Sequence, residues 1–553
     1  MTARVANRRI RLLIALFAAV FAVALLRAGW LQAVRAQALG NLATNQHRET
    51  IEVPPHRGTV YDRRGVELAI GSRATTIYAN PGQIRDPRAA AIAVEQSLGL
   101  DADKVYPLLA DRSRGFVYVE RQADPGLAQS LQDKHIQGFG FYDEERRDYP
   151  QKRIGASVLG YAGVDNKGLA GLELELDKTL TGTRGEKTIV KDPFGHTLQV
   201  VDSKPGSDGK NVYLTLDQSI QGQVERVLEE TRTRWAAKSA SAIVMDPRTG
   251  GILAIANDPG YDANKFPDVS QDRQRNRAVT DTYEPGSTFK IVTISGALET
   301  GIVTPKTKFT LPYEIQVADR KIHDAESRGT QKMTTDEILS RSSNVGVVTI
   351  AEALGQTRVN DWIHRFGFGR PTGIDFPGES KGIVLAPEEW SGSTIGNVPI
   401  GQGIAVTPVQ MIAAYGALAN RGVLIEPHLV DRVGDGERVQ AARRRVVSTQ
   451  TADQVRHMLR EVVEEGSGTA AQVPGYRIAG KTGTAAKPDG AGGYSTSAYV
   501  ASFVGFVPAK HPSLVILVTV DEPRGAIWGG VVAAPAFAEI AKFALQYLEI
   551  PPD

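Results

Sequence analysis

The longest apolar stretch of the chain runs from Leu12 to Leu26, where every residue is Ala, Val, Ile, Leu or Phe. Arg27 and Trp30 follow it, and both residue types are suited to the membrane interface. About twenty residues of this kind cross a bilayer as a helix, so the pattern predicts a transmembrane helix over residues 12–31. A cleaved signal peptide is the alternative, but no clear small-x-small cleavage site comes directly after the run.

Basic residues set the expected orientation of this helix. Four arginines precede it: Arg4, Arg8, Arg9 and Arg11. Because positive charge is retained on the cytoplasmic side, residues 1–11 are predicted to be a cytoplasmic tail. The remaining mass of the chain is then expected outside the membrane, on a single-pass anchor.

After the anchor, the pattern changes to short strands and glycine-rich turns. Gln32 to about Arg48 is polar and helix-compatible, as expected of a stalk that leaves the membrane. Short apolar strands on either side of the turn Asp62–Gly65 predict a β-hairpin over residues 58–69. Without any paired catalytic groups, residues 32–217 are interpreted as a structural, β-rich pedestal. Its acidic run Glu173–Asp177 is interpreted as a solvated face rather than a metal site.

The second half of the chain alternates strands and helices around one expected sheet. The strand Asn211–Asp217 leads into a helix over Gln218–Trp235, and the domain boundary is placed here, with residues 218–553 forming the second domain. Five further strands are predicted: Ser239–Asp246, Gly251–Asn257, Ile478–Ala485, Tyr499–Val507 and Leu514–Val520. A helix over Ala534–Leu548 and a helical middle, including one helix opened by a capping box at Thr334–Glu337, complete the domain. The expected fold class is α+β multidomain, with a five-stranded antiparallel sheet flanked by helices.

Composition narrows the chemistry further. A chain of 553 residues is too long for one core, and a formal net charge of +2 calls for no nucleic-acid partner. The absence of cysteine excludes disulfides, thiol nucleophiles and Cys-ligated zinc. No H-E-x-x-H or P-loop pattern occurs and the nine histidines are scattered, so neither a metal nor a cofactor is expected.

The first candidate for catalysis is the stretch Tyr283–Lys290, which precedes an apolar run at helical spacing. Pro285 and Gly286 end the preceding element, so a helix is predicted to begin at or near Ser287. Ser287 and Lys290 would then lie one turn apart on the same face, near the positive end of the helix dipole. That geometry suits a hydroxyl nucleophile with an amine base, although an isolated S-x-x-K is usually a solvated pair on a helix surface.

Two other short motifs change that interpretation. Ser342-Ser343-Asn344 is placed on a turn between helices, and Lys481-Thr482-Gly483-Thr484 on a strand where Gly483 would let a ligand approach the backbone closely. Each motif alone is weak, since S-S-N also suits an ordinary turn and K-T-G-T an exposed edge. Their occurrence in the order S-x-x-K, S-x-N, K-T-G within one domain is difficult to explain by chance.

With these three motifs the chain resembles the penicillin-binding protein transpeptidases. The anchor and the hairpin from Arg57 resemble the monofunctional class B branch, and further stretches carry the same resemblance: Leu214–Asp217, Gly401–Gly403 with Thr407–Pro408, and Gly466–Thr469. The resemblance covers nearly the whole chain. A short chain without a large insertion is most similar to the septal, division-specific FtsI type.

The resemblance implies a mechanism for the motif residues. Ser287 would attack a terminal D-Ala-D-Ala peptide bond with Lys290 as its base, and Lys481 would lower the pKa of Lys290. Ser342 would relay a proton to the leaving amine, and Asn344 would hydrogen-bond the substrate backbone or Lys290. The substrate would be bound by Thr482, Gly483 and Thr484. The backbone N–H groups of Ser287 and Thr484 would form the oxyanion hole.

The resemblance also implies the surroundings of the enzyme. The expected partners are peptidoglycan stem peptides on lipid II-derived strands, β-lactams, a polytopic FtsW-like glycosyltransferase of the SEDS type and other divisome membrane proteins. The expected location is the inner membrane, with the catalytic domain extracytoplasmic. The alternatives are an elongation-specific transpeptidase, a β-lactamase, or a non-enzymatic β-lactam sensor or divisome scaffold; a glycosyltransferase domain is not expected because no suitable pair of Glu residues occurs.

Overall fold

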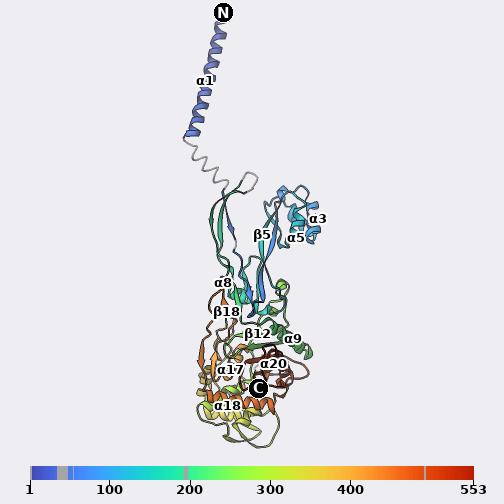
Figure 1. The fold of residues 1–553 in the computed structure, drawn as a ribbon, viewed down its shortest axis with the longest axis vertical. Coiled ribbons are helices and arrows are strands. Elements are labelled where there is room, and N and C mark those ends of the chain that lie inside the picture. Colours follow the sequence, from blue (N-terminus) through green and yellow to red (C-terminus); the bar gives the residue numbers. More distant parts are fainter. Residues whose placement is uncertain (1–2, 34–47, 54, 192–196, 491–492, 553) are drawn as a thin grey trace. The chain divides into compact units, whose positions relative to one another are not determined.

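The computed structural model describes residues 3–33, 48–53, 55–191, 197–490 and 493–552 (Figure 1). The chain packs into two compact units. The smaller one consists of Met1–His56 with Gly182–Gly209, and the larger one of Arg57–Thr181 with Lys210–Asp553. These limits are drawn by packing and differ from the expected domains 32–217 and 218–553, whose boundary stays a prediction.

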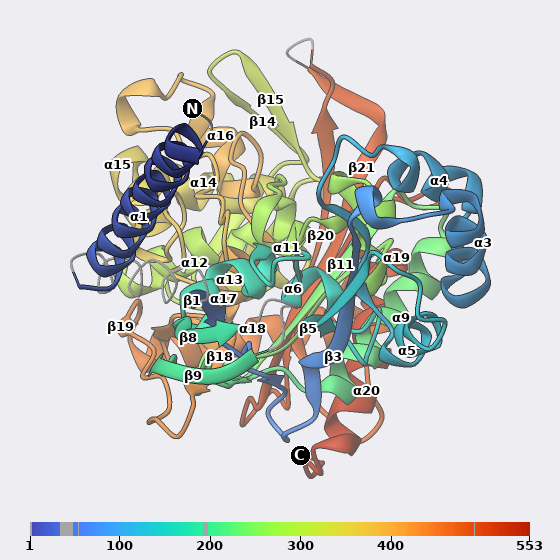
Figure 2. The ribbon, with the colours of Figure 1, turned by 90° about the horizontal axis from the view of Figure 1, so that it is seen from above.

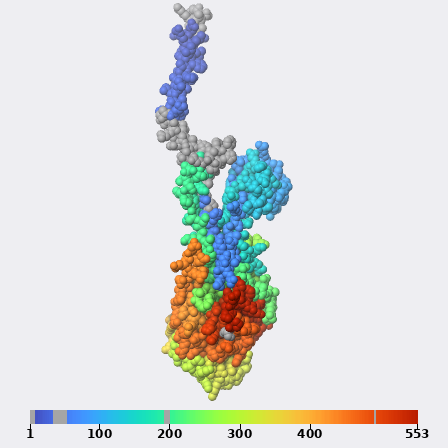
Figure 3. All heavy atoms as spheres, in the orientation of Figure 1, coloured from blue at the N-terminus to red at the C-terminus, as the bar shows by residue number. Residues whose placement is uncertain are grey.

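The smaller unit contains one long helix and one sheet. Helix α1 spans Ala3–Ala33, and its segment Asn7–Gln32 is long and apolar enough to cross a membrane. No part of that segment is buried, as the space-filling view in Figure 3 shows. Strands β1 (Arg48–Val53), β8 (Gly185–Lys191) and β9 (Thr197–Lys204) form an antiparallel sheet. Most of the expected stalk falls outside the described residues.

The first sheet of the larger unit is built around a hairpin. Strands β2 (Val60–Tyr61) and β3 (Glu67–Ala79) pair antiparallel across the turn at Asp62–Gly65, which confirms the predicted hairpin. Strands β4 (Val117–Ala123) and β5 (Phe139–Asp148) both pair with β3. Helices α3, α4 and α5 share a core with these strands and span Pro87–Leu98, Ala102–Ala110 and Pro125–Gln132.

Two short strands from later in the sequence extend this sheet. Strand β10 (Val212–Leu214) pairs parallel with β2, and β18 (Val430–Val433) pairs antiparallel with β10. The segment that leads into the second domain is therefore part of the pedestal's sheet. Its last residue before helix α9, Asp217, caps that helix by accepting hydrogen bonds from the N–H groups of Ser219 and Ile220.

The interpretation of the acidic run as a solvated face is wrong for Glu173. This residue lies on α7 (Gly171–Glu175), is only 1% exposed, and accepts hydrogen bonds from Arg57 Nε at 2.7 Å and Arg147 Nε at 2.6 Å. Arg57 also donates to Asp177 of α8 (Asp177–Thr181) at 2.8 Å. Glu173 is buried with its charge neutralised by two arginines from distant segments, and such burial is tolerated only for paired charges. Glu175 of the same run is exposed.

The second sheet has the predicted five antiparallel strands, in the order β12-β11-β22-β21-β20. The strands are β11 (Ser239–Met245), β12 (Ile252–Asp258), β20 (Ala479–Pro488), β21 (Tyr494–Val507) and β22 (Leu514–Asp521). Successive side chains face opposite sides, so Ile243 and Met245 enter one core while Ala242 and Val244 enter another. Strand β11 is buried along its whole length and is rich in apolar residues, as a strand covered on both faces requires.

Helices cover both faces of this sheet, as Figure 2 shows. Helices α9 (Gln218–Arg234), α19 (Gly529–Val532) and α20 (Ala534–Tyr547) pack on one face. Helix α17 (Pro408–Ala419), buried along its whole length, packs on the other. Behind α17 lie α12 (Lys290–Glu299), α14 (Asn344–Leu354) and α18 (Thr449–Glu464).

The capping box predicted at Thr334 is confirmed. The N–H of Glu337 donates to Thr334 Oγ1 at 3.2 Å, and the N–H of Thr334 donates to Glu337 Oε2 at 2.8 Å. The helix that this box opens is α13, Thr335–Ser340.

The remaining elements are η1 (Pro81–Gln83), α6 (Ala156–Leu159), β6 (Tyr161–Ala162), β7 (Gly168–Ala170), η2 (Ala263–Asp268), α10 (Gln271–Gln274), α11 (Arg277–Thr280), η3 (Gly286–Phe289), β13 (Lys308–Leu311), β14 (Glu314–Val317), β15 (Arg320–His323), β16 (Gln331–Thr334), α15 (Gln356–Arg365), η4 (Pro387–Glu389), α16 (Thr394–Asn397), η5 (Val398–Ile400), β17 (Val423–Ile425), β19 (Arg443–Arg445) and η6 (Thr469–Ala471).

Candidate active site

Ser287 lies at the start of a helical segment, as predicted. A 3₁₀ turn, η3, covers Gly286–Phe289, and α12 continues from Lys290. Gly286 has a φ of 56°, which favours glycine, and its N–H donates to the carbonyl of Gly401 at 3.0 Å. Ser287 is partly exposed, whereas Lys290 is fully buried. The nucleophile candidate is therefore open to solvent while the amine beside it in the motif is not.

The S-x-N turn, Ser342–Asn344, fixes the position of the side-chain nitrogen of Lys290. Its Nζ donates to the Ser342 carbonyl at 2.6 Å, to Ser342 Oγ at 3.2 Å and to Asn344 Oδ1 at 2.7 Å. All three acceptors belong to one turn between α13 and α14, where Ser342 has a φ of 60°. A left-handed serine is uncommon, so the surrounding contacts must hold this conformation.

Lys481 approaches the same turn from strand β20. Its Nζ donates to Ser342 Oγ at 2.9 Å, and the residue is fully buried. Ser342 Oγ therefore lies within hydrogen-bond distance of the amines of both Lys290 and Lys481. The three motifs, which are far apart in the sequence, meet at this one hydroxyl.

Burial changes the charge state of both amines. The pKa of Lys290 lies well below its ordinary value, first because the residue is buried and second because of the positive charge of Lys481, while Asp324 opposes the shift. Burial lowers the pKa of Lys481 to about 7. The expected influence of Lys481 on Lys290 is present, but loss of hydration is the larger cause.

The other K-T-G-T residues contact protein groups. Thr482 Oγ1 lies 2.7 Å from Ser467 Oγ, and Thr484 Oγ1 accepts from the N–H of Gly529 at 3.1 Å. A Cβ added at Gly483 would lie 2.3 Å from Ser502 Oγ and 2.9 Å from the carbonyl of Pro285. The space left by Gly483 is thus filled by protein atoms, which lets strand β20 approach the segment that carries Ser287. The approach of a ligand to the Gly483 backbone stays a prediction.

Sequence reasoning missed a buried carboxylate at the site. Asp324, which directly follows β15, accepts from Ser343 Oγ at 3.0 Å and from the N–H of Val345 at 3.0 Å, and these two residues flank Asn344. No motif identifies this residue because it lies in a polar hairpin connection. Its role is visible only when the S-x-N turn is seen folded against it.

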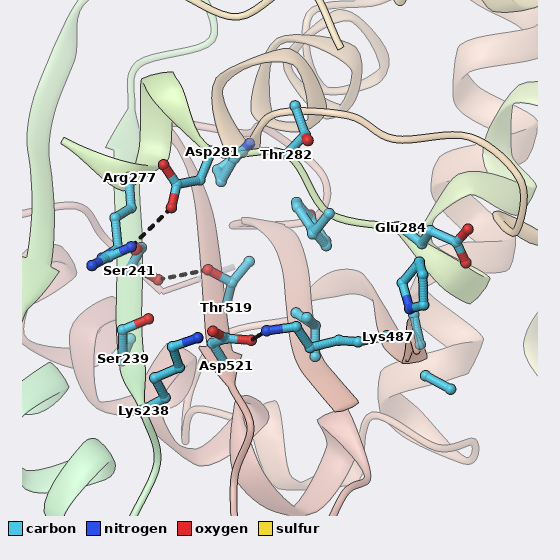
Figure 4. A pocket seen from close by; sticks show the side chains of 17 residues that line it. Lys238, Ser239, Ser241, Arg277, Asp281, Thr282, Glu284, Lys487, Thr519 and Asp521 are labelled. Carbon is cyan, nitrogen blue, oxygen red and sulfur yellow. Dashed lines mark hydrogen bonds and ion pairs between the residues drawn. The ribbon is translucent and has the colours of Figure 1, made fainter. Parts of the chain in front are cut away.

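A cavity of about 230 Å³ lies next to the site, between the five-stranded sheet and the segment Arg277–Glu284 (Figure 4). None of the eight predicted site residues lines it. Its charged groups pair with one another: Lys487 Nζ lies 2.8 Å from Asp521 Oδ1, and Arg277 lies 3.0 Å from Asp281 Oδ2. The catalytic groups therefore lie outside this cavity.

No cluster of three or more metal-ligating side chains of the His, Cys, Asp and Glu types occurs in the part of the chain that the structure describes. The described site residues place the hydroxyl of Ser342 between the amines of Lys290 and Lys481, and the motif that carries Lys290 also carries the candidate nucleophile Ser287. Such an arrangement suits acyl transfer through a serine ester.

Known protein families match this chain. The model of the penicillin-binding protein transpeptidase domain matches residues 240–542, and that of the penicillin-binding protein dimerisation domain matches residues 52–214. The chain belongs to the class B penicillin-binding proteins. By membership of this family it is a serine-type peptidoglycan D,D-transpeptidase.

Relatives of this class B penicillin-binding protein match along nearly their whole lengths. Stage V sporulation protein D of Bacillus subtilis is 34% identical over 567 residues, which cover 99% of this chain and 88% of the relative. The peptidoglycan D,D-transpeptidase FtsI of Escherichia coli is 32% identical over 540 residues, which cover 95% of this chain and 90% of the relative. The crystal structure of penicillin-binding protein 3 from Mycobacterium tuberculosis, complexed with aztreonam, is 32% identical in sequence and has a TM-score of 0.72. The match covers 91% of this chain and 98% of that one.

Proposed function

We propose that this penicillin-binding protein cross-links stem peptides through an ester on Ser287. The hydroxyl oxygen of Ser287 attacks the carbonyl carbon between the two terminal D-alanines, and Lys290 accepts the hydroxyl proton. The carbon–nitrogen bond then breaks, the leaving amine takes a proton, and D-alanine departs. An amine of a neighbouring stem peptide attacks the ester, releases the Ser287 oxygen and completes the cross-link.

The contacts of Ser342 carry this proposal. Its Oγ lies 3.2 Å from Lys290 Nζ and 2.9 Å from Lys481 Nζ, so a proton can pass along this chain of groups to the leaving amine. A lowered pKa favours the neutral form of Lys290, and a base must be neutral to accept a proton. The hydrogen bond from Lys290 to Asn344 supports the expected partnership of these two residues.

The approach of β20 to Ser287 supports the remaining roles. A Cβ added at Gly286 would lie 3.0 Å from the carbonyl of Thr484, so the backbones of the two motifs run side by side. Backbone N–H groups of Ser287 and Thr484 are proposed to bind the developing oxyanion, a contribution of about 3 kcal/mol per donor. The substrate carboxylate is proposed to bind Lys481 with the hydroxyls of Thr482 and Thr484.

A labelled penicillin tests the nucleophile and the base. We expect one label per wild-type chain and a persistent adduct, because rapid hydrolysis of the ester would require an additional base that activates water. We expect no label on Ser287→Ala. Lys290→Ala should abolish acylation because the base is lost, and a circular dichroism spectrum like that of the wild type would show that the chain still folds.

Three outcomes contradict the assignment. Labelling of Ser287→Ala would remove the proposed nucleophile, and an unchanged acylation rate in Lys290→Ala would remove the proposed base. Rapid hydrolysis of penicillin by the wild type would favour a β-lactamase instead.

We further propose that the enzyme acts at the division septum from the inner membrane. Helix α1 supports a single-pass anchor, and the four arginines at its start support a cytoplasmic N-terminus with the catalytic residues outside. A polytopic FtsW-like glycosyltransferase and other divisome proteins are the proposed partners. The names of the relatives do not decide this cellular role, because they include a sporulation protein as well as FtsI.

A fluorescent fusion in dividing cells tests the septal role. We expect the signal at midcell during constriction. A signal along the side wall would instead assign the enzyme to elongation.

A further inference from the structure

Asp324 holds both sides of the turn that carries Ser342 and Asn344. Its carboxylate accepts from Ser343 Oγ at 3.0 and 3.1 Å and from the N–H of Val345 at 3.0 Å. The preceding carbonyl, that of His323, accepts from Asn344 Nδ2 at 2.9 Å. The short segment His323–Asp324 therefore orients Asn344 directly and its two neighbours through the carboxylate.

The surroundings of Asp324 make this carboxylate a rigid support. The residue is 6% exposed, and Arg328, itself mostly buried, donates to its Oδ2 through Nε at 2.9 Å and through a second nitrogen at 2.5 Å. Bidentate pairing of this kind fixes the orientation of a carboxylate as well as neutralising it. Arg328 in turn donates to the carbonyls of Leu311 and Pro312, which tie it to the start of the β14–β15 hairpin.

The turn that Asp324 holds, Ser342–Asn344, is the one whose geometry the proposed reaction needs. Ser342 adopts a left-handed φ of 60° and presents both its carbonyl and its Oγ to Lys290. Without a support, a serine in that conformation returns to more favourable backbone angles, and the three acceptors around Lys290 separate. We propose that Asp324 is a positioning residue of the transpeptidase, which fixes the S-x-N turn and supplies the negative charge that opposes Lys481 at Lys290.

This inference rests on the proposed function and adds a residue to it. Two charged groups act on Lys290 from the elements around it: Lys481 on β20, which lowers its pKa, and Asp324 after β15, which raises it. Ser342 and Asn344 face Lys290 as neutral acceptors, while Arg328 and His323 adjoin Asp324. Removal of the Asp324 charge should therefore lower the pKa of Lys290 further and make the base available at lower pH.

The rate of acylation by a labelled penicillin, measured as a function of pH on the full chain in membranes, tests the inference. We expect Asp324→Asn to acylate about a hundredfold more slowly, because a displaced catalytic group costs about that factor. We also expect the acid limb of its pH profile to move to lower pH. A change that only loosened the fold would lower the amount of active protein without moving that limb.

Two further variants separate position from charge. Ser343→Ala removes the hydroxyl that donates to the carboxylate, together with the cap that the same oxygen gives the N–H of Gly346, but keeps the charge of Asp324. Its rate should therefore fall while its acid limb stays in place. Asp336→Asn is the matched control, because Asp336 is also a buried aspartate in an ion pair, with Lys306 at 2.9 Å, but lies on α13 and does not contact the turn. Its rate and pH profile should match those of the wild type.

The outcomes distinguish this inference from the proposed function. A wild type that takes up no label contradicts the proposed function itself. A labelled wild type with an Asp324→Asn variant of equal rate and unmoved acid limb overturns the inference alone. If Asp324→Asn does not fold, Ser343→Ala decides: a wild-type rate in that variant also overturns it.

Discussion

At the scale of single residues, the site depends on two lysines that are buried around one serine hydroxyl. A buried ammonium is costly, so each lysine loses its proton more readily than in water. The pKa of Lys290 is lowered, which favours the neutral amine that a general base needs, and Lys481 has a pKa of about 7. Lys481 therefore changes its charge in the range in which the enzyme works.

A falling alkaline limb in the acylation rate follows from the Lys481 pKa. As pH rises through about 7, Lys481 loses the positive charge proposed to bind the carboxylate of the substrate or the β-lactam. We expect the second-order rate constant of acylation, measured between about pH 5 and about pH 9, to decline on the alkaline side.

An arginine at the same position provides the control for that limb. Arg keeps its charge throughout this range, so Lys481→Arg should be slower but should lose the alkaline decline. A wild-type rate that still rises up to about pH 10, the ordinary pKa of lysine, would contradict the assigned charge state of Lys481.

At the scale of elements, the pedestal is held by charges that its sequence pattern does not reveal. The acidic run on α7 was expected to face solvent, yet Glu173 pairs with both Arg57 and Arg147 in a buried site. Arg57 is 116 residues and Arg147 26 residues away along the chain, so no local pattern links them to Glu173. Helix α7 is thereby joined to the start of β2 and to strand β5.

Substitution of Glu173 should destabilise the larger unit. Glu173→Gln leaves two buried guanidinium groups without their carboxylate, and breaking a buried ion pair from one side costs about 3–5 kcal/mol. We expect a lower melting temperature by calorimetry. Glu175→Gln is the matched control on the same helix, since Glu175 is exposed and its change should stay within about 0.5 kcal/mol. Equal melting temperatures for the two variants would show that the buried network adds no stability.

At the scale of the whole chain, the sequence predicted those features that depend on local pattern. The five strands of the second sheet are runs bounded by turns, and Thr334–Glu337 forms the capping box that its spacing indicates. The three motifs pointed to one site through family resemblance, and Lys290, Ser342 and Lys481 meet there although nothing local relates them.

Other features depend on contacts that form only in the folded chain. Asp324 lies in a polar connection after a short hairpin, and its contact with Ser343 and Val345 has no sequence signature. The close approach of Gly483 to Ser502 and Pro285 likewise has no sequence signature. Both features depend on neighbours that are distant along the chain.

Mapping of the β-lactam adduct tests the central claim, that Ser287 is the nucleophile, most directly. Trypsin releases Ser287 in the peptide Ala278–Lys290, and the S-x-N serines in the separate peptide Ser342–Arg358. After incubation with penicillin, mass spectrometry should find the acyl group on the first peptide, with fragment ions that place it on Ser287. An adduct on Ser342–Arg358, or no adduct on either peptide, would contradict the account.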